Sequence, residues 1–321
     1  MKNTNSKTTK KEFPYRQGTA KAPSEKRIRK FAGRPLKSFN VLYAYATLPI
    51  GHILGLPAIA SYIFVVANKF FMLQYLQKIH IFHFPVKHVD NELDQKVPFR
   101  PDHIDCYLDF INYWIRPIVM MQKRFGIKQG SKLSIEFLRY IKRCYKEAYK
   151  MYTYSMTTTY RPKCPESRAV TNVQRADPHY LCVPSLHIVV VCLCYSFYRM
   201  LFKRESFTQQ ESEQWNSELY AQAVAIGETV LYVKQHSVNC IPAALYMLTK
   251  ITPELFTPQM AVNFINDLFK NSTDITDADK KEINSYIQFM FERLLLEGAL
   301  EDDWRIPVIR WLDSYKPYEP Q

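Results

Sequence analysis

Residues 180–198 read YLCVPSLHIVVVCLCYSFY and contain no aspartate, glutamate, lysine or arginine. Within them, the short sequence CVPSLH at 182–187 comes before a run of aliphatic and aromatic residues, and a serine in that place is typical of a helix cap. The stretch therefore predicts an apolar helix whose first turn carries two polar side chains, Ser185 and His187.

A second uncharged stretch lies nearer the start of the chain, over residues 38–68. As a helix, its 31 residues would span about 46 Å, more than the roughly 30 Å of a membrane's hydrocarbon core. Pro49, Gly51, Gly55 and Pro57 predict that this helix is kinked or broken. The stretch is typical of a membrane segment, and the alternative is a buried helix pair in a soluble protein.

Three more apolar segments follow, at 104–122, 219–233 and 237–249. Residues 133–156 also show helical periodicity, but they carry seven charged side chains. Each such charge costs about 2.5–3.5 kcal/mol at the centre of a membrane helix, so this segment is a poor lipid-facing span. The pattern as a whole predicts an all-α fold.

The formal net charge of +13 is concentrated at one end of the chain. Residues 1–37 hold 12 basic and two acidic residues, a net charge of +10, whereas residues 38–249 carry +8 and residues 250–321 carry −5. The first segment is lysine-rich and nearly free of aliphatic residues, which predicts a disordered arm, and it lacks the apolar region of a secretory signal peptide. A basic arm before an apolar stretch favours a cytoplasmic N-terminus held against anionic lipid.

The same charge raises the alternative of a soluble protein that binds nucleic acid. The chain has no zinc-finger spacing and no RNP-like motif, and its seven cysteines include no C-x-x-C pair. The expected partner of the basic arm is therefore a membrane surface, with no nucleic acid.

The last part of the chain, from residue 250 onward, has the composition of a soluble segment. Thr276 and Asp279 are spaced as at a helix start, and an amphipathic stripe follows. That stripe consists of Ile283, Ile287, Met290, Leu294 and Leu295. We therefore expect a small helical tail.

Three short segments at the edges of apolar helices carry the residues suited to chemistry: TYRP at 159–162, CVPSLH at 182–187 and YVKQHSVNC at 232–240. Histidine acts as a nucleophile or as a general acid and base near neutral pH. Arginine and lysine neutralise phosphate oxygens, and a serine at a helix N-terminus adds a neutral donor. The residues that these segments contribute are Arg161, Ser185, His187, Lys234 and His236.

This set is what phosphoryl transfer through a phosphohistidine requires, with no metal ion or cofactor. Catalysis would rest on positioning and charge stabilisation. The two histidines would face each other within about 5–6 Å, with a phosphate between hydrogen-bonding groups. If the helices alternate across a membrane, all three segments lie on one side, opposite the N-terminus.

PSLH before an apolar helix, followed by KQH about 50 residues later, resembles the type 2 phosphatidic acid phosphatase superfamily. The branch that it resembles contains inositolphosphotransferase-like and sphingolipid-synthase-like membrane proteins. VPFRP at 97–101 looks similar to a segment common in that branch, and TYRP looks similar to the family's first phosphate-binding motif. The resemblance covers roughly residues 38–249.

The resemblance implies a membrane-embedded core of six helices. With the segments above, it predicts a disordered arm at 1–37, a phosphatase-like core at 38–250 and a helical tail at 251–321. The protein would be a multi-pass membrane protein with both termini in the cytoplasm and the active site on the opposite face.

The family's activity is the metal-independent hydrolysis or transfer of phosphoryl groups of lipid phosphate esters. By motif, the resemblance makes His236 the nucleophile that becomes phosphorylated and His187 the acid that protonates the leaving alcohol. It assigns the binding of the phosphate to Arg161, Ser185 and Lys234.

The chain departs from the family pattern at several positions. The family places an aspartate four residues after the nucleophilic histidine, where Cys240 stands here, and a lysine seven residues before the arginine, where Tyr154 stands. Glu228 and Asp177 are candidates for the missing acid. The alternative function is a catalytically impaired family member that binds phospholipid head groups.

Overall fold

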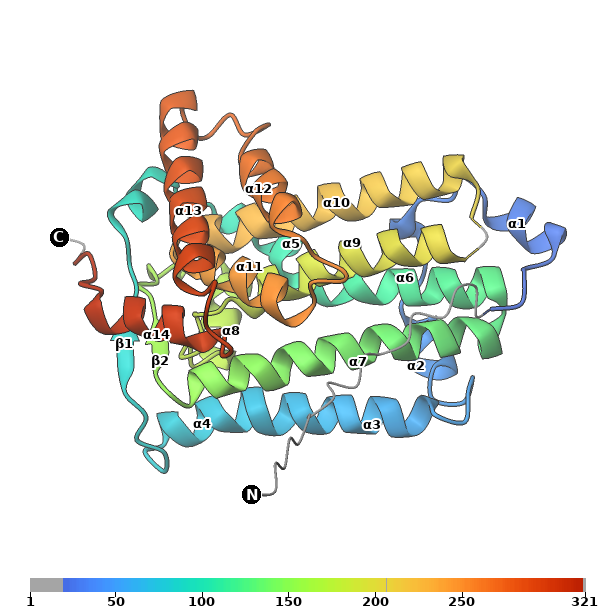
Figure 1. The fold of residues 1–321 in the computed structure, drawn as a ribbon, viewed down its shortest axis with the longest axis horizontal. Coiled ribbons are helices and arrows are strands. Elements are labelled where there is room, and N and C mark those ends of the chain that lie inside the picture. The colour runs from blue at the N-terminus through green and yellow to red at the C-terminus, as the bar shows by residue number, and fades with distance from the viewer. Residues whose placement is uncertain (1–19, 206, 320–321) are drawn as a thin grey trace, which may run out of the picture.

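The computed structural model describes residues 20–205 and 207–319, and these are mostly helical (Figure 1). The helical content agrees with the predicted all-α class. The first 19 residues of the predicted arm lie outside the described residues.

Helix α9 (Leu186–Arg204) is the centre of the molecule. It starts where the sequence predicts, because the Ser185 side chain caps it by accepting a hydrogen bond from the amide of Ile188. An apolar helix has no polar side to turn to water, so it has to be covered on every side. Its neighbours are α6 (Phe110–Phe125), α7 (Ile127–Tyr152), α10 (Gln209–Tyr232) and α11 (Cys240–Ile251).

The uncharged N-terminal stretch is broken where its prolines and glycines predict. Helix α2 (Leu42–Thr47) is followed by a turn, and α3 (Gly55–Val66) then continues through a π-helical segment, Ala67–Met72, into α4 (Leu73–Lys78). The α3–α4 rod packs on α7 at the edge of the bundle (Figure 1).

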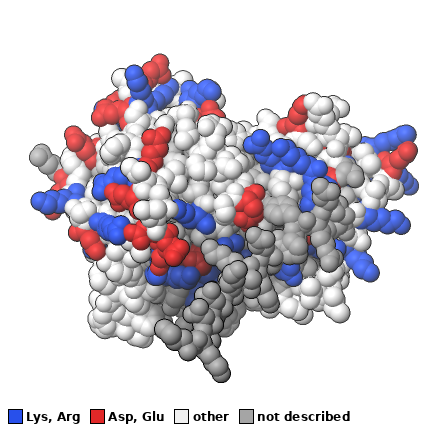
Figure 2. Space-filling model, in the orientation of Figure 1, with Lys and Arg blue, Asp and Glu red and all other residues white. Residues whose placement is uncertain are grey.

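The α3–α4 rod and α9 are the two described helices that are long and apolar enough to cross a membrane, but they differ in burial. The most apolar part of α9 is 78% buried inside the protein, whereas that of the α3–α4 rod is only 11% buried. Figure 2 shows few charged residues along the lower edge of the molecule, where this rod lies. We call its exposed large side chains the apolar face; they include Leu56, Ile63, Phe64, Phe71, Met72 and Tyr75.

Residues 20–37 correct the prediction of a disordered arm. They form α1 (Glu25–Phe31) and a 3-10 turn at Leu36–Ser38, and both Phe31 and Leu36 are buried. The amide of Leu36 donates to a carboxylate oxygen of Glu218 on α10 at 2.6 Å. These few apolar side chains and the acceptors on α10 are sufficient to order this part of the segment.

The C-terminal residues form α12 (Pro258–Asp267), α13 (Asp277–Glu297) and α14 (Arg305–Ser314). Thr276 caps α13 by accepting from the amide of Asp279, which confirms the predicted helix start. The apolar stripe of α13 is buried in the same hydrophobic core as α9.

The remaining elements gather at the end of the bundle where α9 begins (Figure 1). Strands β1 (Val86–His88) and β2 (Met156–Thr158) pair there in parallel. Helices α5 (Ile104–Leu108) and α8 (Arg168–Ala176), and 3-10 turns at Glu92–Lys96 and Pro101–His103, complete this end.

The C-terminal tail also lies at this end. The Tyr315 hydroxyl and the Tyr318 amide both donate to the carbonyl of Asp90.

Candidate functional site

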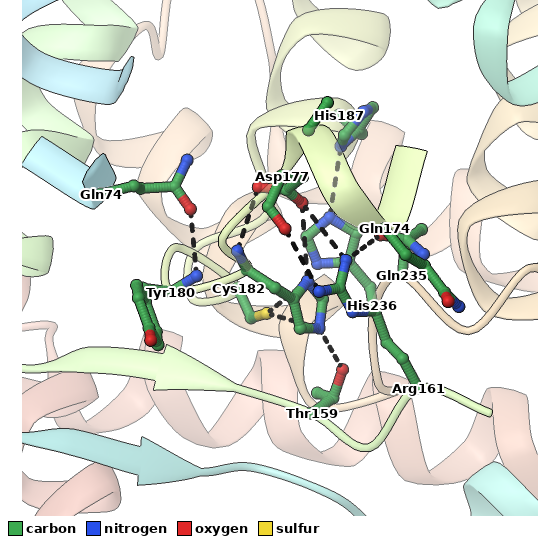
Figure 3. A network of polar contacts seen from close by, with 12 residues as sticks. Gln74, Thr159, Arg161, Gln174, Asp177, Tyr180, Cys182, His187, Gln235 and His236 are labelled. Carbon is green, nitrogen blue, oxygen red and sulfur yellow. Dashed lines mark hydrogen bonds and ion pairs between the residues drawn. The ribbon is translucent and has the colours of Figure 1, made fainter. Parts of the chain in front are cut away.

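Three of the five residues predicted for the site are in contact. His236 lies in the loop between α10 and α11, and its Nε2 atom is 3.2 Å from Nδ1 of His187 and 3.2 Å from Oγ of Ser185 (Figure 3). The His236 side chain is only 8% exposed. Ser185 also caps α9, so the histidine pair sits at a helix N-terminus, where free amides and the helix dipole favour an anion.

The two histidines are closer than a bound phosphate permits. Their ring centres are 5.4 Å apart, within the predicted range, but the nearest nitrogen atoms hydrogen-bond directly. His187 is also flanked by the rings of Tyr107 and Phe110, with centroids 4.9 Å and 4.6 Å away. Entry of a phosphate therefore requires the His187 side chain to move away from His236.

Arg161 belongs to the same cluster. It follows β2, and its guanidinium donates to the side chain of Gln235 and to the carbonyl of Asp177, each at 3.2 Å. Gln235 directly precedes His236 in the chain. The Arg161 side chain is 17% exposed, so part of it is accessible to solvent.

Lys234 was predicted to bind a phosphate, but its side chain contacts backbone carbonyls instead. Its ammonium group donates to the backbone carbonyls of Asp94 and Val97. Burial lowers the pKa of Lys234, while the charge of Asp94 opposes this effect. The carboxylate of Asp94 in turn accepts from the amide of Val238 at 2.8 Å. Lys234 thus fastens the His236 loop to the segment at 94–97.

A second cluster beside His236 was not predicted. The Nε2 atom of His179 is 2.8 Å from Oγ1 of Thr159 and 3.6 Å from Sγ of Cys182, and its Nδ1 atom is 3.7 Å from a carboxylate oxygen of Asp177 (Figure 3). The sequence signal was the spacing DPHYLC at 177–182, directly before the PSLH motif.

Charge is balanced within this second cluster. Burial would lower the pKa of His179, but the Cys182 sulfur and Asp177 outweigh it and raise that pKa to about 9. Burial would raise the pKa of Asp177, but its bonds to His179 hold it at about 2. The raised pKa favours the imidazolium form of His179 next to the Asp177 carboxylate.

Position 240, where the resemblance predicts an aspartate, holds a buried thiol. Cys240 begins α11, and its carbonyl accepts from the amide of Ser185 at 3.4 Å. Nδ1 of His236 is buried and has no hydrogen-bond partner among the described residues.

Neither acid that the sequence offered as a substitute lies in that place. Glu228 accepts from the amide of Phe269, on the side of α10 that faces the tail. Asp177 is bound to His179 and Arg161.

The C-terminal tail holds the His236 loop from outside. The Asn239 side chain donates to the carbonyl of Val89 and to the hydroxyl of Tyr315, and it accepts from the hydroxyl of Tyr286 at 2.6 Å. The predicted appendage is therefore part of the support of the site.

Two further features bear on ligands. In residues 20–205 and 207–319, no three His, Cys, Asp or Glu side chains are grouped so that they could hold a metal ion. A cavity of about 930 Å³ lies away from the histidine pair, against α13, and is lined by Tyr286, Phe289 and Tyr318 among others.

Comparisons with protein-family models, with curated proteins and with solved structures found no match for this chain.

We predict that Lys234 is a structural residue. Replacing it with methionine leaves the carbonyls of Asp94 and Val97 without their donor, so Lys234→Met is expected to lower the free energy of unfolding by about 1–3 kcal/mol. Urea denaturation followed by circular dichroism measures this loss. The exposed Lys281→Met is the control and is expected to change stability by less than about 0.5 kcal/mol. Equal stability of the two variants would contradict the prediction.

Proposed function

We propose that this protein is a metal-independent phosphatase or phosphotransferase that acts on lipid phosphate esters through a phosphohistidine. The observation that carries the proposal is the convergence of His236, His187 and Ser185 at the N-terminus of α9, with Arg161 beside them. These groups come from three segments that are far apart in the sequence and supply a nucleophile, an acid and donors for a phosphate.

The first half of the proposed reaction forms the phosphohistidine. Nε2 of His236 attacks phosphorus and the bond from phosphorus to the ester oxygen breaks. His187, in its protonated form, gives its proton to that oxygen, so the lipid leaves as a neutral alcohol. Arg161, Ser185 and the first amides of α9 stabilise the charge that builds on the other phosphate oxygens.

The second half returns the enzyme to its starting state. His187, now neutral, takes a proton from water or from an acceptor alcohol, whose oxygen attacks phosphorus. The bond from phosphorus to Nε2 of His236 breaks, and phosphate or a new phosphate ester leaves. A water acceptor makes the protein a phosphatase, and an alcohol acceptor makes it a phosphotransferase.

A lipid substrate is supported by the apolar face of the α3–α4 rod. A large exposed apolar surface on a folded protein indicates contact with a membrane or another protein, and the rod has a length and composition that suit a bilayer. We propose a multi-pass bundle of α3–α4, α6, α7, α9, α10 and α11, with a cytoplasmic N-terminus, in which the rod makes the main lipid contact.

We predict that release of phosphate depends on His236. Purified protein is expected to release phosphate from short-chain phosphatidic acid. His236→Ala is expected to lower kcat by about 10⁴-fold or more, as in other enzymes whose catalytic nucleophile is replaced. Phosphate release measures the rate, and acid-labile labelling of the protein with radioactive phosphate measures the intermediate.

The matched control is His83→Ala, which removes an exposed histidine outside the site. This variant is expected to retain wild-type activity and labelling. Equal phosphate release by His236→Ala and the wild type would refute the proposed function.

We also predict that the apolar face binds the membrane. Ile63→Asp with Phe64→Asp places two charges on the face, each costing about 2.5–3.5 kcal/mol at a helix centre in a bilayer. The wild type is expected in the vesicle pellet after a high-salt wash, and the double variant in the supernatant. Leu300→Asp changes a fully exposed leucine of the tail and serves as the control. Pelleting of the double variant like the wild type would contradict the prediction.

A second function is favoured by Cys240, which stands where the family has its aspartate. In this alternative, the protein is a catalytically impaired family member that binds phospholipid head groups. The buried Nδ1 atom of His236, which lacks an aspartate partner, supports it.

Cys240→Asp distinguishes the two functions. An impaired protein is expected to gain phosphate-releasing activity when the carboxylate is restored. An active phosphatase is expected to gain nothing, because it already turns over without that carboxylate. Steady-state phosphate release by both proteins, at equal concentration, measures the difference.

A further inference from the structure

A second cavity lies between α9, α10 and α12, and none of the predicted site residues lines it. Its volume is about 420 Å³, which is within the range of about 300–1,000 Å³ for sites that bind small molecules. Each helix supplies two side chains that are four residues apart and therefore lie on one face of that helix. These pairs are Tyr195 and Arg199 on α9, Asn216 and Tyr220 on α10, and Asn263 and Asp267 on α12.

Two residues that line this cavity have a buried polar atom without a partner. Tyr195 is 4% exposed, and its hydroxyl makes no hydrogen bond with residues 20–205 or 207–319. The same is true of the buried Oδ1 atom of Asn216. A buried polar atom without a partner costs free energy, so two of them in one cavity indicate a missing ligand. That ligand would offer an acceptor to Tyr195 and a hydroxyl donor to Asn216.

The charges of the lining favour an anion. Asp267 is the acidic residue of the cavity, and its carboxylate is already compensated by the Tyr220 hydroxyl at 2.8 Å and the Lys270 ammonium group at 3.1 Å. Arg199 has no such partner, because it makes no ion pair or hydrogen bond within the described part of the chain. Its guanidinium is therefore available to a negatively charged ligand.

A larger cavity of about 800 Å³ adjoins this one and shares Arg199, Met260 and Asn263 with it. It adds Lys203, which also forms no ion pair with a described residue, whereas the neighbouring Arg204 binds Glu136 and Glu205. The open side of the smaller cavity therefore carries a net positive charge, which would attract an anion from solution.

We propose that the cavity between α9, α10 and α12 binds a small, soluble phosphate ester of a sugar or another polyol. Arg199 binds the phosphate, and the hydroxyl of Tyr195, one helical turn earlier, donates to the same group. A hydroxyl of the ligand donates to Oδ1 of Asn216. Arg199 is 12 residues beyond His187 on α9, or about 18 Å along the helix axis, so this site is separate from the histidine pair and does not rest on the proposed reaction.

The position of the cavity favours a soluble ligand over a lipid head group. Figure 1 shows α10 and α12 on the side of α9 that lies opposite the α3–α4 rod, and α7 packs between α9 and α3. The cavity is therefore remote from the apolar face. Apart from Met260, the side chains that line it are polar, so they offer little surface to an acyl chain.

The test is isothermal titration calorimetry with the full chain carrying His236→Ala, so that the proposed reaction cannot consume the ligand. Glucose 6-phosphate is the probe. It is expected to bind about 10-fold or more tightly than either glucose or inorganic phosphate, because each of these offers only part of the required groups. Adding Arg199→Met is expected to weaken the binding by about 10- to 100-fold, and adding Tyr195→Phe by about 3- to 10-fold.

Two matched variants control for structure. Tyr198→Phe removes another buried hydroxyl of α9 that lacks a partner among the described residues but does not line the cavity. Arg143→Met replaces an exposed arginine of α7. Both are expected to keep the affinity for glucose 6-phosphate. Tyr195→Phe is expected to keep the melting temperature of the ligand-free protein, since its hydroxyl makes no bond there.

No binding of glucose 6-phosphate would overturn the proposal, and so would equal affinities of Tyr195→Phe and Tyr198→Phe. Equal binding of inorganic phosphate would overturn the role of the ligand's hydroxyl groups. Displacement of the probe by phosphatidylglycerol vesicles, but not by glycerol 3-phosphate, would overturn the soluble source. Because His236 is absent throughout, none of these results depends on whether the wild type releases phosphate.

Discussion

The burial of α9 is the constraint on which the rest of the structure depends. From Leu186 to Tyr198 this helix carries no charged side chain and is almost entirely buried, so it is stable only when α6, α7, α10 and α11 cover it. Because interiors are closely packed, the first turn of α9 is held at a defined place at one end of the bundle. Ser185 and His187 belong to that turn, and the precision of the site therefore comes from the packing of the core.

The polar groups at this end form a connected system, because burial is costly for any group without a partner. Lys234, Asp94 and Asn239 bind the His236 loop to neighbouring backbone, while His179 and Asp177 support the sulfur of Cys182. The loop that carries His236 is consequently held by neighbouring backbone. The α3–α4 rod stands apart from this system, since its surface is apolar and exposed and provides contact with lipid in the proposed function.

Local patterns in the sequence predicted the features that depend on local physics. These are the start of α9 at Ser185, the break between α2 and α3, and the cap of α13 at Thr276. The contact of His187 with His236 was expected from the order of the motifs along the chain. The features that the sequence did not predict depend on contacts between distant residues. Leu36 is ordered by Glu218, 182 residues later, and Lys234 reaches carbonyls about 140 residues earlier.

The contact between Asn239 and Tyr315 gives the site a dependence on the order of synthesis. The two residues are 76 positions apart in the chain. During translation, both histidines emerge from the ribosome before this tyrosine does. The residue that holds the His236 loop from outside is therefore made later than the residues that would react.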